Sequence, residues 1–463
     1  MIPSLKTIAL ALTATLASAQ VAPAELQTAG FNSSFALLSA QIEAASLSDS
    51  TVASLNNVVR YDQSQLANGG PAEDDFYTLP LLENTTQPLK AGTLLKVQSF
   101  TDTTNYTLPP NTALSRIIYT STNLNGTVLP ASAFIFWPFQ PPRRPQRPSS
   151  SGRTAHPAFF ASNAPSAHRA LWYGDAAPFA LTLDGYAVVA PDYAGLGIST
   201  SWDGSPIPHQ YLASPTSAHD ALSALRAARK AFQDLLSDDY VVMGHSQGGG
   251  VAWGVAEVLE AEADTFADLT PGYPGIIAGS PTTDVLSGMA QFIVPWVGMI
   301  LQGIFPDFDI AKWLTPLGIA RVELLREIEG GISASQQLFL TGEEVVKASY
   351  NETWYVDAYA RLANAGRKPF RSPMLVLQGT ADGYRSGVRR RGGTGHVPTL
   401  DATRPVWMQW IRDRFEGKAV AQTGCVTTHL ESFLPIGQYQ ATGNAFLQWA
   451  GATEYGFETP LGP

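Results

Sequence analysis

The stretch that most constrains the fold is DDYVVMGHSQGGG, at residues 238–250. Its apolar run predicts a short buried strand, its glycines predict a sharp turn, and the following VAWGVAEVLEAEA (251–263) predicts a helix. A buried strand that passes through a tight turn into a helix is typical of an α/β fold. This stretch therefore favours a sheet whose strands are connected by helices.

The same alternation continues along the chain. Segments rich in Val, Ile and Leu predict further buried strands, and one segment has the apolar spacing of a helix. Together they predict an α/β fold with a mostly parallel sheet. The strand segments are 184–197, 273–281 and 372–382, and the helical segment is 216–236.

Before these segments, residues 115–139 predict two strands joined by an Asn-Gly turn at Asn125 and Gly126, which is a strong hairpin signal. The next residues, QPPRRPQRPSSSGR (140–153), contain prolines and arginines that disfavour regular structure.

A long segment between the last two predicted strands is too long for a loop and has helical character. Its apolar run at 289–305 is interrupted by Gln291, Pro295 and Gln302, so a cap helix is favoured over a transmembrane span. We expect a signal peptide at 1–19, an N-terminal extension at 20–112, a core at 113–284, a helical cap at 285–370, and a second core part with a C-terminal tail at 371–463.

The N-terminus predicts export. Lys6 precedes an apolar run at 7–16 and small residues at 17–19, which together are typical of a secretory signal peptide. A buried N-terminal helix is the alternative. Five N-x-S/T sequons fit a secreted, extracellular glycoprotein, at Asn32, Asn84, Asn105, Asn125 and Asn351.

Composition excludes some partners. A net charge of −10 argues against nucleic acid. His and Cys residues show no metal-ligand spacing, so we expect no metal and no cofactor. Cys425 is the single cysteine and implies a free thiol, an intermolecular bridge or a lost partner.

Residues 244–248 form the pattern G-x-S-x-G around Ser246. A tight strand-to-helix turn lifts the serine side chain clear of the sheet, and it directs the Gln247 backbone N–H toward the place where an oxyanion develops. A plain glycine-rich turn is the alternative interpretation. The strand before and the helix after favour a nucleophilic serine.

Several segments together resemble the secretory lipase family of α/β hydrolases, the lipase-A type: VVAPDYAGLG, AHDALSALRAAR, GHSQGGG, LVLQGTAD and GHVPTLDATRPVWMQWIRDRF. The likeness covers roughly residues 75–450. It implies an extracellular carboxylic-ester hydrolase with a helical cap, in which Ser246 matches the nucleophile, Asp382 the acid and His396 the base.

Other histidines compete with His396. His245 lies inside the turn and cannot reach around to Ser246, so we expect it to pack there. His429 follows Asp382 at a more usual distance and stays an alternative base. The remaining histidines precede the serine, against the chain order of this fold: His156, His168, His209 and His219.

We therefore expect a lipase or carboxylesterase that acts through an acyl-enzyme on an ester or lipid substrate, with a lipid–water interface as a candidate partner and without a transmembrane anchor. Two alternatives stay open: a serine peptidase of the same fold, and a catalytically impaired binding paralogue.

The binding alternative arises from two departures from the family pattern. The family has a His-Gly turn that supplies a second oxyanion donor, whereas residues 143–166 offer only Ala155-His156-Pro157, whose proline lacks an N–H. Thirteen residues separate Asp382 from His396, too few for a crossover helix and a strand.

We expect both segments, 139–157 and 383–394, to be irregular, and the sheet to lack one strand at each place. An incomplete gene model and an evolved, degenerate paralogue both account for them.

Overall fold

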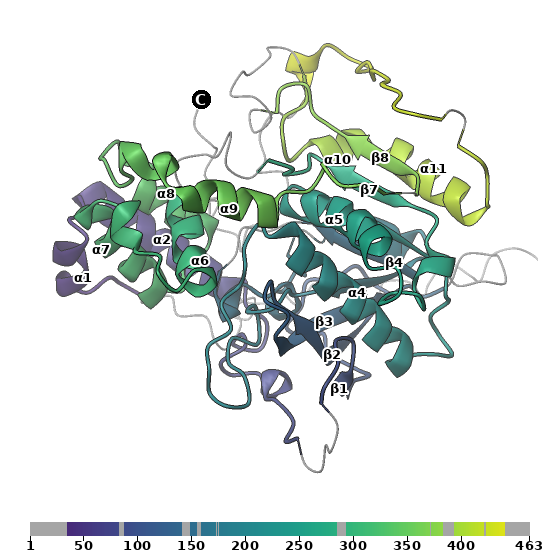
Figure 1. The fold of residues 1–463 in the computed structure, drawn as a ribbon, viewed down its shortest axis with the longest axis horizontal. Coiled ribbons are helices and arrows are strands. Elements are labelled where there is room, and N and C mark those ends of the chain that lie inside the picture. The colour runs from purple at the N-terminus through teal and green to yellow at the C-terminus, as the bar shows by residue number, and fades with distance from the viewer. Residues whose placement is uncertain are drawn as a thin grey trace, which may run out of the picture.

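Among the residues that the computed structural model describes, eight strands form one mixed sheet at the centre of the molecule (Figure 1). The described residues are 35–82, 88–140, 149–154, 159–172, 174, 176–284, 293–370, 372–382, 393–420 and 423–439. The strands lie in the order β1-β2-β3-β5-β4-β6-β7-β8. They are β1 Leu94–Gln98, β2 Ala113–Thr122, β3 Val128–Trp137, β4 Ser149–Thr154, β5 Ala187–Pro191, β6 Tyr240–His245, β7 Ile276–Gly279 and β8 Met374–Leu377.

Strand direction divides the sheet into two parts. The pairs β1–β2, β2–β3 and β3–β5 are antiparallel. From β5 through β4, β6 and β7 to β8, the pairing is parallel. The α/β class is as predicted, but a mostly parallel sheet is not confirmed, because three of the seven strand pairs among the described residues are antiparallel.

The predicted hairpin is confirmed by strands β2 and β3, which pair from Ala113 opposite Trp137 to Thr122 opposite Val128. In the connecting loop Gly126 has φ +82°, a conformation that glycine adopts without strain. The side chain of Asn125 accepts a hydrogen bond from the Thr127 backbone at 2.9 Å.

Strand β4 corrects one expectation. Residues 139–157 were expected to be irregular and to leave the sheet one strand short, but Ser149–Thr154 pairs in parallel with both β5 and β6. The reason is that sheet hydrogen bonds join backbone groups, and SSSGRT contains no proline to remove a donor. Of the second segment, residues 383–392 lie outside the described residues, and no described strand follows β8.

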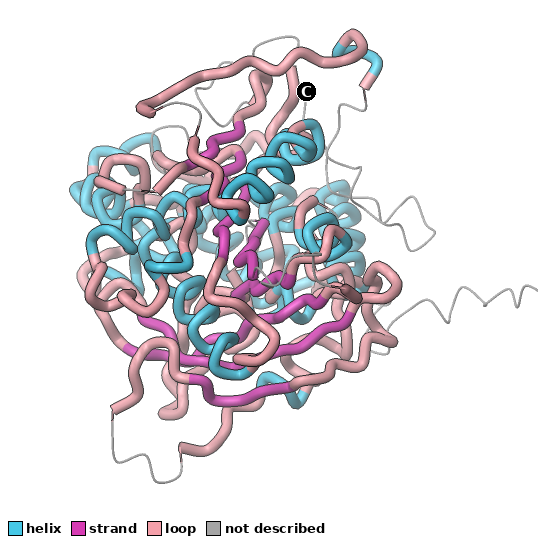
Figure 2. The backbone as a smooth tube through the Cα atoms, turned by 90° about the vertical axis from the view of Figure 1, so that its right-hand side faces the viewer, coloured by secondary structure: helices cyan, strands magenta, loops and turns pink. Residues whose placement is uncertain are grey.

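Helices cover both faces of the sheet, and this explains its apolar strands. In Figure 2 the strands run through the middle with helices on both sides. Tyr240 and Val242 of β6 pack in the cluster that contains α4 Ser214–Ala231 and α5 Gln247–Ala261. Val241 and Met243 point to the other face, where α3 Pro178–Leu183 and α11 Arg404–Phe415 lie. Successive strand residues face opposite sides, so a doubly covered strand must be apolar throughout.

A group of helices beside the sheet combines two distant parts of the chain (Figure 1). The segment between β7 and β8 forms α6 Val294–Ile304, α7 Pro316–Glu327, α8 Ile332–Phe339 and α9 Trp354–Ala363. The N-terminal helices α1 Ser39–Ala44 and α2 Asp49–Ser64 belong to the same group, and buried residues near and within them share one apolar cluster with α6–α9. The N-terminal extension and the predicted cap therefore share one core. No described helix is long and apolar enough to cross a membrane.

The remaining helices are short. They are α10 Thr399–Ala402 and the 3-10 turns Asp75–Tyr77, Ala161–Asn163, Pro165–Ala167, Thr270–Gly272, Ile310–Lys312, Ala348–Glu352 and Ile436–Gln438.

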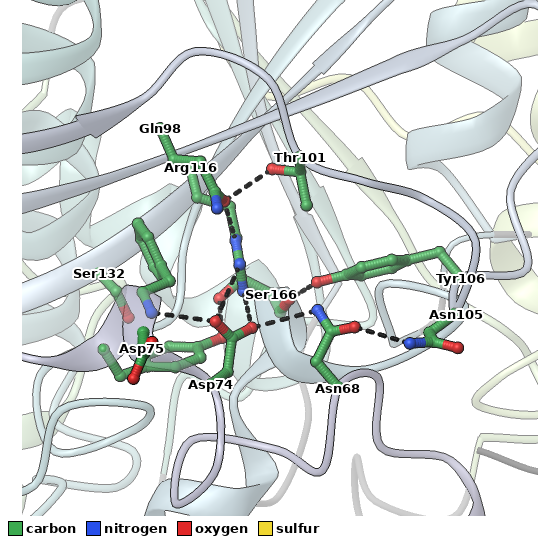
Figure 3. Close-up of polar contacts among 12 residues, drawn as sticks. Asn68, Asp74, Asp75, Gln98, Thr101, Asn105, Tyr106, Arg116, Ser132 and Ser166 are labelled. Carbon is green, nitrogen blue, oxygen red and sulfur yellow. Dashed lines mark hydrogen bonds and ion pairs between the residues drawn. The ribbon is translucent and has the colours of Figure 1, made fainter. Parts of the chain in front are cut away.

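A buried polar network ties the segment between α2 and β1 to β2 (Figure 3). From Arg116, Nε donates to Oε1 of Gln98 and Nη1 donates to Oδ2 of Asp74, both at 2.7 Å. Asp74 also accepts from Asn68 at 3.2 Å, and Asn68 accepts from Asn105 at 2.9 Å. The Arg116 side chain is only 1% exposed, so these partners offset the free-energy cost of burying its charge.

Candidate active site

Ser246 lies at the turn between β6 and α5, where its φ is +57° and its ψ is −118°. The turn is held by backbone hydrogen bonds from Ser246 N–H to the Gly279 carbonyl (2.9 Å) and from Thr282 N–H to the Ser246 carbonyl (3.2 Å). A Cβ on Gly249 would lie 2.5 Å from the Gly279 oxygen, so only glycine permits this approach. The sequence thus forms the strained turn that presents a serine side chain in α/β hydrolases.

Asp382 and His396 form a contact next to the end of β8. Nδ1 of His396 lies 2.8 Å from Oδ2 of Asp382, and the Asp382 side chain is almost fully buried. Nε2 of Gln378 donates to the same carboxylate oxygen at 2.6 Å. Because an ionised carboxylate only accepts, the neutral His396 ring carries its proton on Nδ1, which leaves Nε2 able to accept a proton.

His245 connects this pair to the serine turn. Its Nε2 donates to the His396 carbonyl at 2.9 Å, and the two ring centroids are 4.7 Å apart. Burial lowers the pKa of His245, the adjacent His396 contributes in the same direction, and the resulting pKa of about 3 keeps His245 neutral at physiological pH. His245 therefore packs in the turn. Because His245 directly precedes Ser246, its hydrogen bond also connects the backbone of His396 to the serine turn.

The residue predicted to donate to an oxyanion, Gln247, lies in the first turn of α5. Gln247 is its first residue, and a helix leaves its first backbone N–H groups without intrahelical partners. The Gln247 N–H hydrogen-bonds to none of the described residues. Ala155-His156-Pro157, the nearest match to the family's His-Gly turn, lies outside the described residues.

The other histidines lie in different surroundings. His168 is buried against the Trp172 ring, with centroids 4.1 Å apart. His219 contacts Oγ1 of Thr122 at 2.8 Å and Oε1 of Glu262 at 3.0 Å. His429 is exposed in the 423–439 segment, as is Cys425. His156 lies outside the described residues.

His209, which the sequence analysis excluded as the catalytic base, contacts the residue that follows Ser246. Its Nε2 lies 3.2 Å from Nε2 of Gln247. Chain order excluded it as the base, but chain order does not bear on a supporting role. Among the described residues, no group of three or more His, Cys, Asp or Glu could hold a metal ion.

The fold is similar to those of two solved hydrolases. Candida antarctica lipase A in its closed state matches with a TM-score of 0.57 at 16% identity, covering 76% of this chain and 88% of that chain. The rice cell wall degrading esterase LipA from Xanthomonas oryzae matches with a TM-score of 0.51 at 18% identity, covering 71% of this chain and 99% of that chain. No protein-family model and no curated protein sequence matches the chain. The predicted resemblance to lipase-A-like hydrolases is confirmed at the level of the fold.

Proposed function

We propose that this protein is a serine hydrolase that cleaves carboxylic esters, of the lipase or carboxylesterase type. The observation that carries the proposal is a pair of contacts: His396 pairs with Asp382, and His245, the residue directly before Ser246, donates a hydrogen bond to the His396 carbonyl. Two proteins of similar fold are named a lipase and an esterase, which supports an ester as substrate.

The proposed mechanism assigns one step to each group. Nε2 of His396 takes the Ser246 proton, and Oγ attacks the ester carbonyl. The Gln247 backbone N–H donates to the resulting oxyanion. The histidine then protonates the leaving alcohol, and an acyl-enzyme forms at Ser246. Water, activated by the same histidine, releases the acid and restores the serine.

Asp382 keeps the imidazole in the tautomer that this mechanism needs. It holds the proton on Nδ1 and stabilises the imidazolium when Nε2 is protonated. Gln378 donates to the same carboxylate oxygen of Asp382 as His396 does, and this second hydrogen bond further restricts rotation of the carboxylate.

Export and a lipid-like substrate are further parts of the proposal. The signal-peptide pattern at 1–19 supports secretion. The apolar helix α6, with Trp296 buried in the cap core, supports a cap that accommodates an acyl chain.

A fluorophosphonate probe followed by peptide mass analysis tests the proposal directly. We expect labelling of Ser246 and hydrolysis of p-nitrophenyl esters, with the acyl-length preference separating a lipase from a short-chain esterase. A folded protein that neither reacts with the probe nor hydrolyses any of these esters would contradict the proposal and favour a binding paralogue.

A further inference from the structure

The side chain of Gln247 is held by a specific contact as well as by packing. It is 2% exposed, and its Nε2 lies 3.2 Å from Nε2 of His209, which is itself 3% exposed. The Oε1 of Gln247 has no hydrogen-bond partner among the described residues. The amide therefore depends on His209 for its one described side-chain hydrogen bond.

The direction of this hydrogen bond follows from the other side of the imidazole ring. Nδ1 of His209 lies 3.0 Å from the carbonyl oxygen of Ala194. A carbonyl can only accept, so in the neutral ring Nδ1 carries the proton and Nε2 is an acceptor. Gln247 must then present its N–H to His209, since the opposite orientation would place Oε1 against a ring nitrogen lone pair.

The ring that accepts this bond is itself rigidly placed. Tyr193 stacks on His209 with ring planes 4° apart, and Tyr211 contacts it edge-on. A Cβ on Gly195 would lie 2.4 Å from the His209 backbone nitrogen, so the two segments approach as closely as glycine allows. Ala194, whose carbonyl orients the ring, donates its own N–H to the buried Asp220 at 3.0 Å.

We propose that His209 is a positioning residue for the oxyanion donor. The contact fixes the Gln247 side chain, and that side chain fixes the orientation of the first peptide of α5, whose N–H donates to the oxyanion in the proposed mechanism. The inference rests on the proposed function. It adds a loop ahead of α4 to the groups that determine the geometry of the site.

Two substitutions separate positioning from packing. In His209→Asn, the amide nitrogen can still donate to the Ala194 carbonyl, but no atom reaches Gln247. In His209→Gln, the longer side chain can place Oε1 where Nε2 lay and accept from Gln247. We expect His209→Asn to lower kcat on a p-nitrophenyl ester by about tenfold to hundredfold with little change in KM, less than the loss of a whole oxyanion donor. His209→Gln should recover most of that loss.

A double-mutant cycle with Gln247→Ala completes the test. His209→Asn should cause little further loss once Gln247 is alanine, because both substitutions remove the same hydrogen bond. His168→Asn is the matched control, since it also replaces a buried imidazole, one whose ring nitrogens form no hydrogen bond among the described residues, and it should retain kcat even if thermal stability falls.

The outcomes distinguish the two proposals. Two results with an active wild type would overturn the role of His209 and leave the proposed hydrolase function standing. One is an equal loss of activity in His209→Asn and His209→Gln. The other is additive effects of His209→Asn and Gln247→Ala. A folded wild type that is inert toward esters and the fluorophosphonate probe overturns both.

Discussion

Nδ1 of His396 lies 2.8 Å from Oδ2 of Asp382, although only thirteen residues separate them, too few for the usual crossover. The flanking structure accounts for this. Asp382 follows β8. His245 of β6 donates to the His396 carbonyl at 2.9 Å, and Leu400 and Trp407 pack in the same buried cluster as other residues of β6. The sheet and α10 thus place each residue independently of the chain between them.

Ser246→Ala should abolish ester hydrolysis, because it removes the oxygen that forms the acyl-enzyme. Folding should change little, since the hydrogen bonds at this turn come from the Ser246 backbone. Initial rates with a p-nitrophenyl ester and a thermal melt measure both effects. Ser223→Ala, at a buried serine of α4, is the control and should stay active. Residual activity above about a tenth of wild type would remove Ser246 from the mechanism.

His396→Ala should lower kcat by about 10³-fold or more, because it removes the imidazole that takes the serine proton in the proposed mechanism. His429→Ala should change kcat by less than about twofold, since that side chain is exposed. Steady-state kinetics of the two variants in parallel decides the matter. The opposite ranking would transfer the role of base to His429.

Asp74→Asn should destabilise the fold by about 3–5 kcal/mol, because the buried Arg116 would keep its charge without its ionic partner. Chemical denaturation measures the change. Asp184→Asn, which breaks the exposed ion pair with Arg412, is the control and should cost less than about 1 kcal/mol.

The same ion pair predicts a pH dependence. Burial raises the pKa of Asp74, but the hydrogen bond and charge of Arg116 outweigh it and hold the pKa below its usual value. The stabilisation is therefore present above about pH 4 and lost as the pH falls through the folded-state pKa. In Asp74→Asn, the free energy of unfolding should fall less steeply as the pH is lowered below about 4. An unchanged fall would show that other carboxylates cause the loss of stability at low pH.

Asp62 of α2 should make stability depend on pH in the opposite direction. Burial raises its pKa to about 7, although a hydrogen bond from the Gly331 backbone lowers it in part. A folded-state pKa above the unfolded value of about 4 means that stability falls as pH rises from about 4 to 7, by roughly 1 kcal/mol per pH unit. Asp62→Asn should therefore stabilise the protein at pH 8 and change little at pH 4. Chemical denaturation at both pH values measures the effect. If Asp62→Asn shifts the denaturation midpoint relative to wild type by the same amount at both pH values, the raised pKa of Asp62 is contradicted.

Local sequence determined the elements that depend on near neighbours. The hairpin follows from the Asn-Gly turn at Asn125 and Gly126, and the serine turn follows from an apolar run, glycines and a helix in direct succession. These signals are readable because backbone preference and side-chain period act over a few residues.

Tertiary structure decided what depends on segments distant in the chain. Ser149–Thr154 became a strand because β5 and β6 offer backbone partners on both sides, and the N-terminal helices joined the cap through a shared apolar cluster. The contact of His209 with Gln247 spans thirty-eight positions, so no local pattern could indicate it. Hydrogen-bond partners and burial are properties of the folded neighbourhood, and a residue's own sequence context does not contain them.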